Sequence, residues 1–192
     1  MLKIVLIRHF PTDGNMHKRY IGITDEPLCE EGKKMVDTIP YPSVEEVFTS
    51  PLIRCRETAR LIYQDLTATV IEDLKECDFG EFENKNYLEL SQNEKYQAWV
   101  DSNGILPFPG GEEPEHFKAR TINAFQNVLE ASIKKGYHSI ALVVHGGTIM
   151  SILESCADPK KDYYHWQVDN GKGYIAYLEE KEGRLLNICS IH

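Results

Sequence analysis

Two short apolar runs, each followed closely by a histidine, constrain what this chain can fold into. The first run, residues 3–7, leads into Arg8 and His9, and the second, residues 140–144, leads into His145. Uninterrupted Val, Ile and Leu runs are typical of strands buried on both faces of a sheet. In open α/β sheets, ligands bind beyond the carboxyl ends of such strands. The sequence therefore predicts that both imidazoles lie at one ligand site, although they are far apart in the chain.

Strand and helix patterns alternate along the rest of the chain, which predicts an α/β fold. We expect a three-layer sandwich with a central, mostly parallel sheet and helices on both faces. The last two strands flank a turn at Glu182-Gly183 and are expected to pair antiparallel at an edge. One domain covering residues 1–192 is expected, with a small helical cap at about 83–110. The other expected strands are 44–49, 69–71, 174–178 and 185–189, and the expected helices are 30–37, 51–66, 88–100, 114–135 and 149–156.

Composition excludes several classes of protein. A formal net charge of −9 argues against a general nucleic-acid or membrane-surface binder. No apolar stretch could span a bilayer, and the first residues lack the apolar core and cleavage site of a signal peptide. The five cysteines include no Cys-x-x-Cys pair, which favours the reduced thiols of a cytoplasmic protein over a disulfide framework or a zinc site.

His9 carries the first chemical hypothesis. A histidine at a strand end can be a partly buried structural residue, but imidazole can also attack an electrophile with one nitrogen while a hydrogen bond fixes the other. Arg8 beside it favours the chemical interpretation, because a guanidinium presents a planar fork of donors that matches two phosphate oxygens. The pair predicts phosphoryl chemistry.

Arg54 lies in the first turn of a helix that Ser50 is expected to cap and Pro51 to begin. A cation there costs roughly 0.3–1 kcal/mol in exposed contexts, because a helix N-terminus already carries partial positive charge. A solvated arginine can tolerate that cost. A bound phosphate would reverse it, since the helix start and the guanidinium would hold the same anion.

The segment after His145 repeats this pattern. Gly146 and Gly147 permit close approach of the backbone to a ligand, and the helix that Thr148 is expected to cap offers free N–H groups. Many ordinary turns contain two glycines, so the pattern gains its meaning from being paired with His9.

Protonation of a leaving alcohol needs a carboxylic acid near the ester oxygen. The acids available in one loop are Glu76, Asp78, Glu81 and Glu83. Most loop carboxylates are simply solvated, and spacing alone does not choose among these four.

Five segments, taken in order, resemble motifs of the histidine phosphatase superfamily, also called the phosphoglycerate mutase-like family. The resemblance covers nearly the whole chain and implies the fold expected above. The five segments are LIRHFPTDGN (6–15), SPLIRCRETA (50–59), LKECDFGEFEN (74–84), FPGGEEPEHFKAR (108–120) and LVVHGGTI (142–149).

Carried over by position, the resemblance makes His9 the nucleophile that becomes a phosphohistidine and Glu76 the proton donor. It implies no metal and no other cofactor, because arginines and histidines stabilise the charge that a divalent ion handles in other phosphoryl-transfer sites. The residues that it implies to contact the phosphoryl group or substrate are Arg8, Asn15, Arg54, His145 and Gly146.

Three positions depart from the family pattern. Phe10 stands where the family has glycine, Pro11 where many members have glutamate, and Met150 where an arginine is common. Phe10 bears on the shape of the pocket floor, and Pro11 argues against a close copy of the glycolytic mutases. None of the three removes a catalytic group.

The expected activity is metal-independent hydrolysis of a small phosphate ester, with no nucleic acid or membrane as partner. The short cap would admit water to the phosphohistidine, whereas the longer mutases retain it. The acid-bearing segment and PGGE resemble those of alpha-ribazole phosphatases, so alpha-ribazole 5'-phosphate is the expected substrate, with Tyr20 and Trp99 on its side of the pocket. Two alternatives stay open: a phosphoglycerate mutase, and a non-catalytic phospho-ligand binder in which Phe10 blocks attack.

Overall fold

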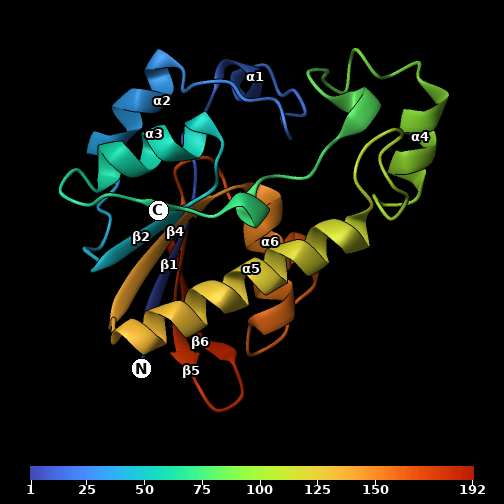
Figure 1. Ribbon diagram of the computed structural model, residues 1–192. Coiled ribbons are helices and arrows are strands. Elements are labelled where there is room, and N and C mark those ends of the chain that lie inside the picture. Colours follow the sequence, from blue (N-terminus) through green and yellow to red (C-terminus); the bar gives the residue numbers. More distant parts are fainter.

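A six-stranded sheet forms the middle layer of the molecule, and the computed structural model describes all residues from 1 to 192 (Figure 1). The strand order is β3-β2-β4-β1-β5-β6. The first four strands in this order are mutually parallel, while β5 and β6 are antiparallel to their neighbours. The expected mostly parallel sheet with an antiparallel edge hairpin is therefore confirmed. The strands are β1 (Lys3–Arg8), β2 (Glu46–Thr49), β3 (Thr69–Val70), β4 (Ser139–Val144), β5 (Gly173–Glu179) and β6 (Arg184–Ile191).

Helices cover both faces of the sheet, with α2 and α3 on one face and α5 and α6 on the other (Figure 1). The alternation of side chains along β1 explains this arrangement. Leu6 packs in one core with Phe125 of α5, and Ile7 packs in a second core with Cys55 of α3. The helices are α1 (Asp13–Met16), α2 (Glu30–Lys34), α3 (Ile53–Ile62), α4 (Glu94–Asp101), α5 (Pro114–Lys135) and α6 (Gly146–Cys156).

The helix α5 matches its prediction at both ends. Pro114 occupies the first turn, where its missing N–H costs nothing, and Gly136 ends the helix at φ 75° in the left-handed region that glycine tolerates. Most of the apolar face expected from its spacing is buried: Phe125, Val128 and Leu129 pack in the sheet core, whereas Ile133 at the end of the helix is exposed.

The start of α3 was predicted wrongly. The helix begins at Ile53, and Ser50 is not its cap. The Ser50 hydroxyl instead accepts a hydrogen bond from the Leu52 N–H and lies 2.7 Å from a ring nitrogen of His145. A carboxylate from elsewhere in the chain supplies the cap, because Asp25 Oδ1 accepts the Ile53 N–H at 2.6 Å.

The cap of α6 was also predicted wrongly. The helix begins at Gly146 with His145 in the N-cap position, and neither the His145 side chain nor Thr148 caps it. Thr148 lies within the first turn, and its hydroxyl donates to the Leu74 carbonyl at 3.5 Å. The helix therefore starts directly at the end of β4, which brings its first N–H groups next to the histidine.

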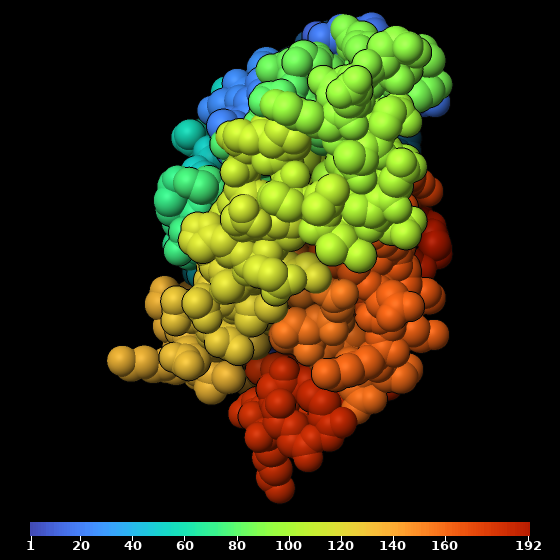
Figure 2. Space-filling model, turned by 90° about the vertical axis from the view of Figure 1, so that its right-hand side faces the viewer, coloured from blue at the N-terminus to red at the C-terminus, as the bar shows by residue number.

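The cap segment holds less helix than expected, because α4 covers Glu94–Asp101 and residues before it form turns. Its interior is a small aromatic cluster in which Phe82 and Tyr96 are buried. Trp99 and Phe108 pack on this cluster, with their ring centroids 5.2 Å apart. In Figure 2 this segment, drawn in green, forms one end of the molecule above α5 (yellow) and residues of the α6 region (orange).

All five cysteines are free thiols. None of the helices combines the length and the apolar composition that crossing a bilayer requires.

We expect Leu142→Ala to lower the free energy of unfolding by about 2–5 kcal/mol, because it leaves a cavity under a central strand. Leu142 is fully buried in β4, whereas Leu88 is 65% exposed. Urea unfolding checks this, with Leu88→Ala as the matched control at within about 0.5 kcal/mol of the parent. Equal effects of the two substitutions would contradict the assignment of β4 to the core.

Candidate active site

The parallel pairing of β1 and β4 brings the two predicted histidines together. Arg8 and Val144 are paired in register at the carboxyl ends of these strands. The His9 N–H donates to the Val144 carbonyl at 3.0 Å, which extends the pairing by one residue. The rings of His9 and His145 lie edge to face, with their centroids 5.2 Å apart.

His9 is held in one orientation and one tautomer. Its Nδ1 lies 2.6 Å from the carbonyl oxygen of Phe10, which can only accept, so Nδ1 carries the proton and donates it. The other nitrogen, Nε2, then has a free lone pair and accepts from Arg54 Nε at 3.3 Å. Burial, together with the charges of Arg54 and Arg8, lowers the pKa of His9 well below its ordinary value of 6.5. The ring is therefore a neutral base or nucleophile at physiological pH.

Arg54 lies in the first turn of α3, fully buried. One terminal nitrogen donates to the Thr24 carbonyl at 2.6 Å, and the other donates to the Gly22 carbonyl at 2.7 Å. These contacts fix the plane of the guanidinium and leave Nε directed at His9. A buried cation so close to the ring favours any negative charge that develops there.

His145 is completely buried behind His9. Its Nε2 lies 2.7 Å from Ser50 Oγ, and Cys55 Sγ lies 3.5 Å from the same nitrogen. Burial and the charge of Arg54 lower the pKa of His145 well below 6.5. Sequence reasoning missed Ser50 as a partner of this ring, because the Ser-Pro pair was interpreted as a helix start.

Arg8 presents an unsatisfied donor to the site. Its Nη1 donates to the Val168 carbonyl at 2.7 Å, but its buried Nε has no hydrogen-bond partner. Burial lowers the pKa of Arg8, and the guanidinium still stays charged. Gly146 lies beside this donor, since a Cβ at position 146 would be in ordinary van der Waals contact with Nε at 3.5 Å. An anion is the natural partner for such a group.

Asn15 stands beside this donor on α1. Its side-chain oxygen accepts from the Thr12 N–H and from Asn170 Nδ2, each at 3.3 Å. The amide NH2 group is thereby left as the part that can donate to an anion. Asn170 also donates to the His9 carbonyl at 3.0 Å, a role that no sequence pattern indicated.

A cavity of about 200 Å³ joins these groups. Among the predicted site residues, Arg54 and His145 are not at its surface but lie behind His9. The predicted residues that line the cavity are Arg8, His9, Asn15, Glu76 and Gly146.

Glu76 lines the same cavity as His9 and is 7% exposed. Its two carboxyl oxygens accept the N–H groups of Cys77 and Gly147, each at 3.1 Å. A Cβ at Gly147 would come within 2.5 Å of the carboxyl, so only glycine allows this approach. Burial raises the pKa of Glu76, and the two N–H donors with the nearby arginines offset it only in part.

The other three acids of this loop have different partners. Asp78 accepts the Gly80 N–H at 2.8 Å, and Glu81 pairs with Lys95 at 2.7 Å. Glu83 is occupied by the Gly22 N–H at 3.2 Å and by further donors in the same loop. Of the four candidates, Glu76 alone lines the cavity beside His9.

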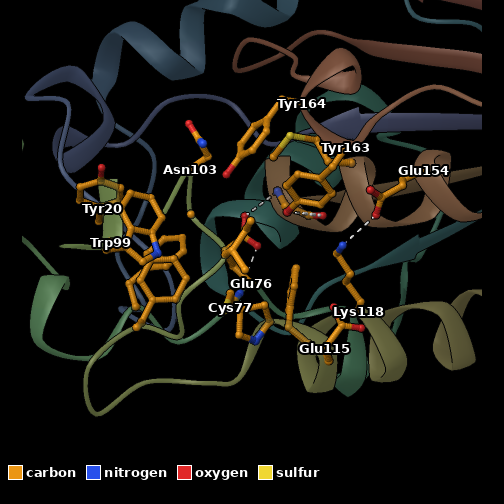
Figure 3. A pocket seen from close by; sticks show the side chains of 18 residues that line it. Tyr20, Glu76, Cys77, Trp99, Asn103, Glu115, Lys118, Glu154, Tyr163 and Tyr164 are labelled. Carbon is orange, nitrogen blue, oxygen red and sulfur yellow. Dashed lines mark hydrogen bonds and ion pairs between the residues drawn. The ribbon is translucent and has the colours of Figure 1, made fainter. Parts of the chain in front are cut away.

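A second, larger pocket of about 400 Å³ adjoins the first, and Glu76 and Gly147 line both. Figure 3 shows Glu76 at its floor, Tyr20 and Trp99 on one side and Tyr163 on the other. The structure thus places Tyr20 and Trp99 on the side expected from the sequence. The remaining aromatic walls are Phe79, Phe108, Phe117 and Tyr164.

The residues that depart from the family pattern lie where they do not obstruct His9. The Phe10 ring is fully buried and packs edge to face on Tyr41, 6.1 Å between centroids, rather than lining either pocket. Pro11 is also buried, and its carbonyl accepts the Cys29 N–H at 3.2 Å. Met150 lines both pockets.

The family model of the histidine phosphatase superfamily (branch 1) matches residues 4–190. The chain belongs to the histidine phosphatase superfamily. The predicted phosphoglycerate mutase-like fold is confirmed by a solved structure, that of an alpha-ribazole-5'-P phosphatase from Escherichia coli described as putative. The two share 26% identity at a TM-score of 0.82, over 100% of this chain and 96% of that one.

Two curated relatives show the range of activities among similar histidine phosphatases. An adenosylcobalamin/alpha-ribazole phosphatase of Escherichia coli is 29% identical over 88% of this chain and 87% of its own length. A 2,3-bisphosphoglycerate-dependent phosphoglycerate mutase 2 of Gloeobacter violaceus is 30% identical over 80% of this chain and 74% of its own length. Family and relatives together make this histidine phosphatase an enzyme that hydrolyses phosphoric monoesters.

We expect both buried imidazoles of this phosphatase to stay neutral at pH values where an ordinary histidine is protonated. ¹⁵N NMR of the rings should show His9 as the Nδ1–H tautomer with a pKa well below 6.5, and His9→Asn assigns its signals. The stability contributed by the neutral rings is present above pH 6.5 and is lost as the pH falls through the folded-state pKa. A His9 signal that titrates at or above pH 6.5 would contradict this.

Proposed function

We propose that this histidine phosphatase hydrolyses a small phosphate ester without a metal ion, through a phosphohistidine on His9. One observation carries the proposal. A fixed, neutral His9, Arg8 with its unpartnered Nε, and the buried acid Glu76 all line one cavity. These are a nucleophile, an anion-binding group and a proton donor, which is the set that ester cleavage needs.

In the first step, His9 Nε2 gives up its hydrogen bond from Arg54 Nε, its lone pair attacks phosphorus, and the bond from phosphorus to the ester oxygen breaks. Glu76, whose pKa is raised by burial, gives a proton to the leaving alcohol. Nδ1–H stays bonded to the Phe10 carbonyl and holds the ring in line. Arg8 and Asn15 bind the phosphoryl oxygens, and Arg54 and His145 stabilise the charge from behind the ring.

In the second step, water attacks phosphorus and the N–P bond breaks. The Glu76 carboxylate now takes a proton from that water, which returns both side chains to their starting forms and releases inorganic phosphate. The segment 83–110 acts as a cap over the larger pocket, and it leaves this face open to water.

The alcohol part of the ester occupies the larger pocket. Its walls are mostly aromatic rings, and Glu76 connects it to the phosphate cavity, so a flat aromatic group attached through a short polar linker fits it. Alpha-ribazole 5'-phosphate has this form, and the similarity to alpha-ribazole phosphatases supports it as the substrate and cobalamin biosynthesis as the pathway.

Two other functions are distinguished by the same assays. The 30% identity to a phosphoglycerate mutase favours isomerisation of phosphoglycerates as the second candidate. A mutase would interconvert the two phosphoglycerates with little release of inorganic phosphate, and a non-catalytic binder would bind esters without turnover.

We expect His9→Ala to lose turnover by about a thousandfold or more while inorganic phosphate still binds through Arg8. The parent should yield an acid-labile phosphoenzyme and release phosphate in the presence of EDTA, and the variant should yield neither. The matched control is His17→Ala, which removes an exposed imidazole elsewhere. Near-normal turnover in His9→Ala would remove this residue as the nucleophile, and loss of the parent's activity in EDTA would remove metal independence.

We expect Trp99→Leu to raise KM for alpha-ribazole 5'-phosphate about tenfold, since it removes one aromatic wall, with about threefold or less change for a small alkyl phosphate. Steady-state kinetics on both esters check this. Val100→Ala, at an exposed neighbouring position on the same helix, is the control. Equal changes for both esters would show that the alcohol part lies elsewhere.

A further inference from the structure

The half-buried side chain of Arg120 makes a set of contacts that the proposed chemistry does not use. It lies on α5 and is 10% exposed at its side chain. Its guanidinium donates to three main-chain carbonyls of the acid-bearing loop: those of Asp73 and Lys75 at 2.8 Å each, and that of Glu76 at 3.0 Å. Sequence reasoning gave Arg120 no role, although it closes the FPGGEEPEHFKAR motif.

Glu112 completes this arrangement. Its two carboxyl oxygens accept from Nε and Nη2 of Arg120, each at 2.8 Å, in a two-pronged pair. Burial acts to raise the pKa of Glu112, but the hydrogen bonds and charge of Arg120 outweigh it and the pKa lies below its ordinary value. The carboxylate therefore neutralises the guanidinium beside the loop.

The charge of Arg120 does not set the acidity of Glu76. The cations that lower the pKa of Glu76 against the effect of burial are Arg54 and Arg8. Arg120 touches the main-chain oxygen of Glu76 and not its carboxyl group. What remains for Arg120 is the geometry of the main chain on which the acid is mounted.

That geometry has little tolerance. The carboxyl of Glu76 is seated on the Gly147 N–H at 3.1 Å, at a position where a single added carbon would come within 2.5 Å. Arg120 also lies over the ring of Phe117, 4.9 Å from its centroid, and Phe117 lines the larger pocket next to Gly147. One side chain thus ties the loop of the acid to the helix that forms the pocket wall.

We propose that Arg120, paired with Glu112, is a positioning residue that aims the Glu76 carboxyl at the ester oxygen. The inference rests on the proposed role of Glu76 as proton donor. It assigns to Arg120 the alignment of that donor, and not contact with substrate. A shift of about 1 Å in a catalytic group can cost about a hundredfold in rate, so loss of this clamp should act on proton donation.

The test uses two esters that differ in their need for the acid. The aryl oxide of an ester such as 4-nitrophenyl phosphate can leave without being protonated, whereas the alkoxide of an alkyl phosphate needs a proton in order to leave. We expect Arg120→Met to lower kcat for the alkyl ester about 10- to 100-fold more than for the aryl ester, with KM for the aryl ester nearly unchanged. The measured quantity is the ratio of kcat for the alkyl ester to kcat for the aryl ester. Arg120→Lys keeps the charge but cannot reproduce the forked contacts, so it should lower this ratio as Arg120→Met does.

Two further variants make the result specific. Arg184→Met is the matched control, because it removes a guanidinium that pairs with Asp158 at 2.7 Å on a distant edge strand, and its ratio should equal the parent's. Glu76→Gln should show the same selective loss for the alkyl ester. The double variant Glu76→Gln/Arg120→Met should have the same ratio as Glu76→Gln alone, because Arg120 cannot affect proton donation once the acid has been removed.

The inference is overturned if folded Arg120 variants slow both esters equally. It is also overturned if the double variant has a lower ratio of alkyl to aryl kcat than Glu76→Gln alone. Thermal melts establish which variants are folded. If Arg120→Met is not folded, the kinetics of Arg120→Lys provide the test. If Glu76→Gln is selective and the Arg120 variants are not, the inference alone fails. If Glu76→Gln slows both esters equally, the proton donor of the proposed function fails and the inference fails with it.

Discussion

The pairing of β1 with β4 is the constraint on which the rest of the structure depends. Arg8 and Val144 end neighbouring parallel strands in register, so the residues that follow them must leave the sheet side by side. This brings two imidazoles from opposite halves of the chain to a ring separation of 5.2 Å. Both strands are buried on both faces, and a slip of one residue would turn each core side chain to the wrong layer.

Burial then determines the chemical state of the groups gathered there. Removing a site from water favours neutral imidazoles and a protonated carboxyl, and the same change in solvation strengthens the field of the two arginines. A neutral imidazole and a carboxyl group whose pKa is raised therefore line one small cavity. Burial is the largest cause of both shifts, and the charges of Arg54 and Arg8, which lower the pKa of His9 and of Glu76, do not cancel the effect of burial on Glu76.

Periodicity and residue type predicted the parts of the fold that local chemistry determines. The runs before His9 and His145, and the proline and glycine that bound α5, specify their elements with little help from the rest of the chain. Resemblance added Glu76, which spacing could not choose. Partners made by tertiary contact stayed out of reach. Asp25 makes the cap contact that was expected of Ser50, and the Ser50 hydroxyl lies next to His145 instead. The contacts of Asn170 and Arg120 likewise join segments far apart in the chain.

The fixed guanidinium of Arg54 has a consequence for how this scaffold can diversify. Its terminal nitrogens are committed to the carbonyls of Gly22 and Thr24, and Glu83 holds the same loop through the Gly22 N–H. We expect an insertion between Gly22 and Thr24 to change the orientation of the Arg54 guanidinium next to His9. Trp99 and Phe108, by contrast, line the larger pocket with their rings and make no side-chain hydrogen bond to the residues of the smaller cavity. Substrate choice can therefore drift on the aromatic side of the molecule while the machinery of transfer stays untouched.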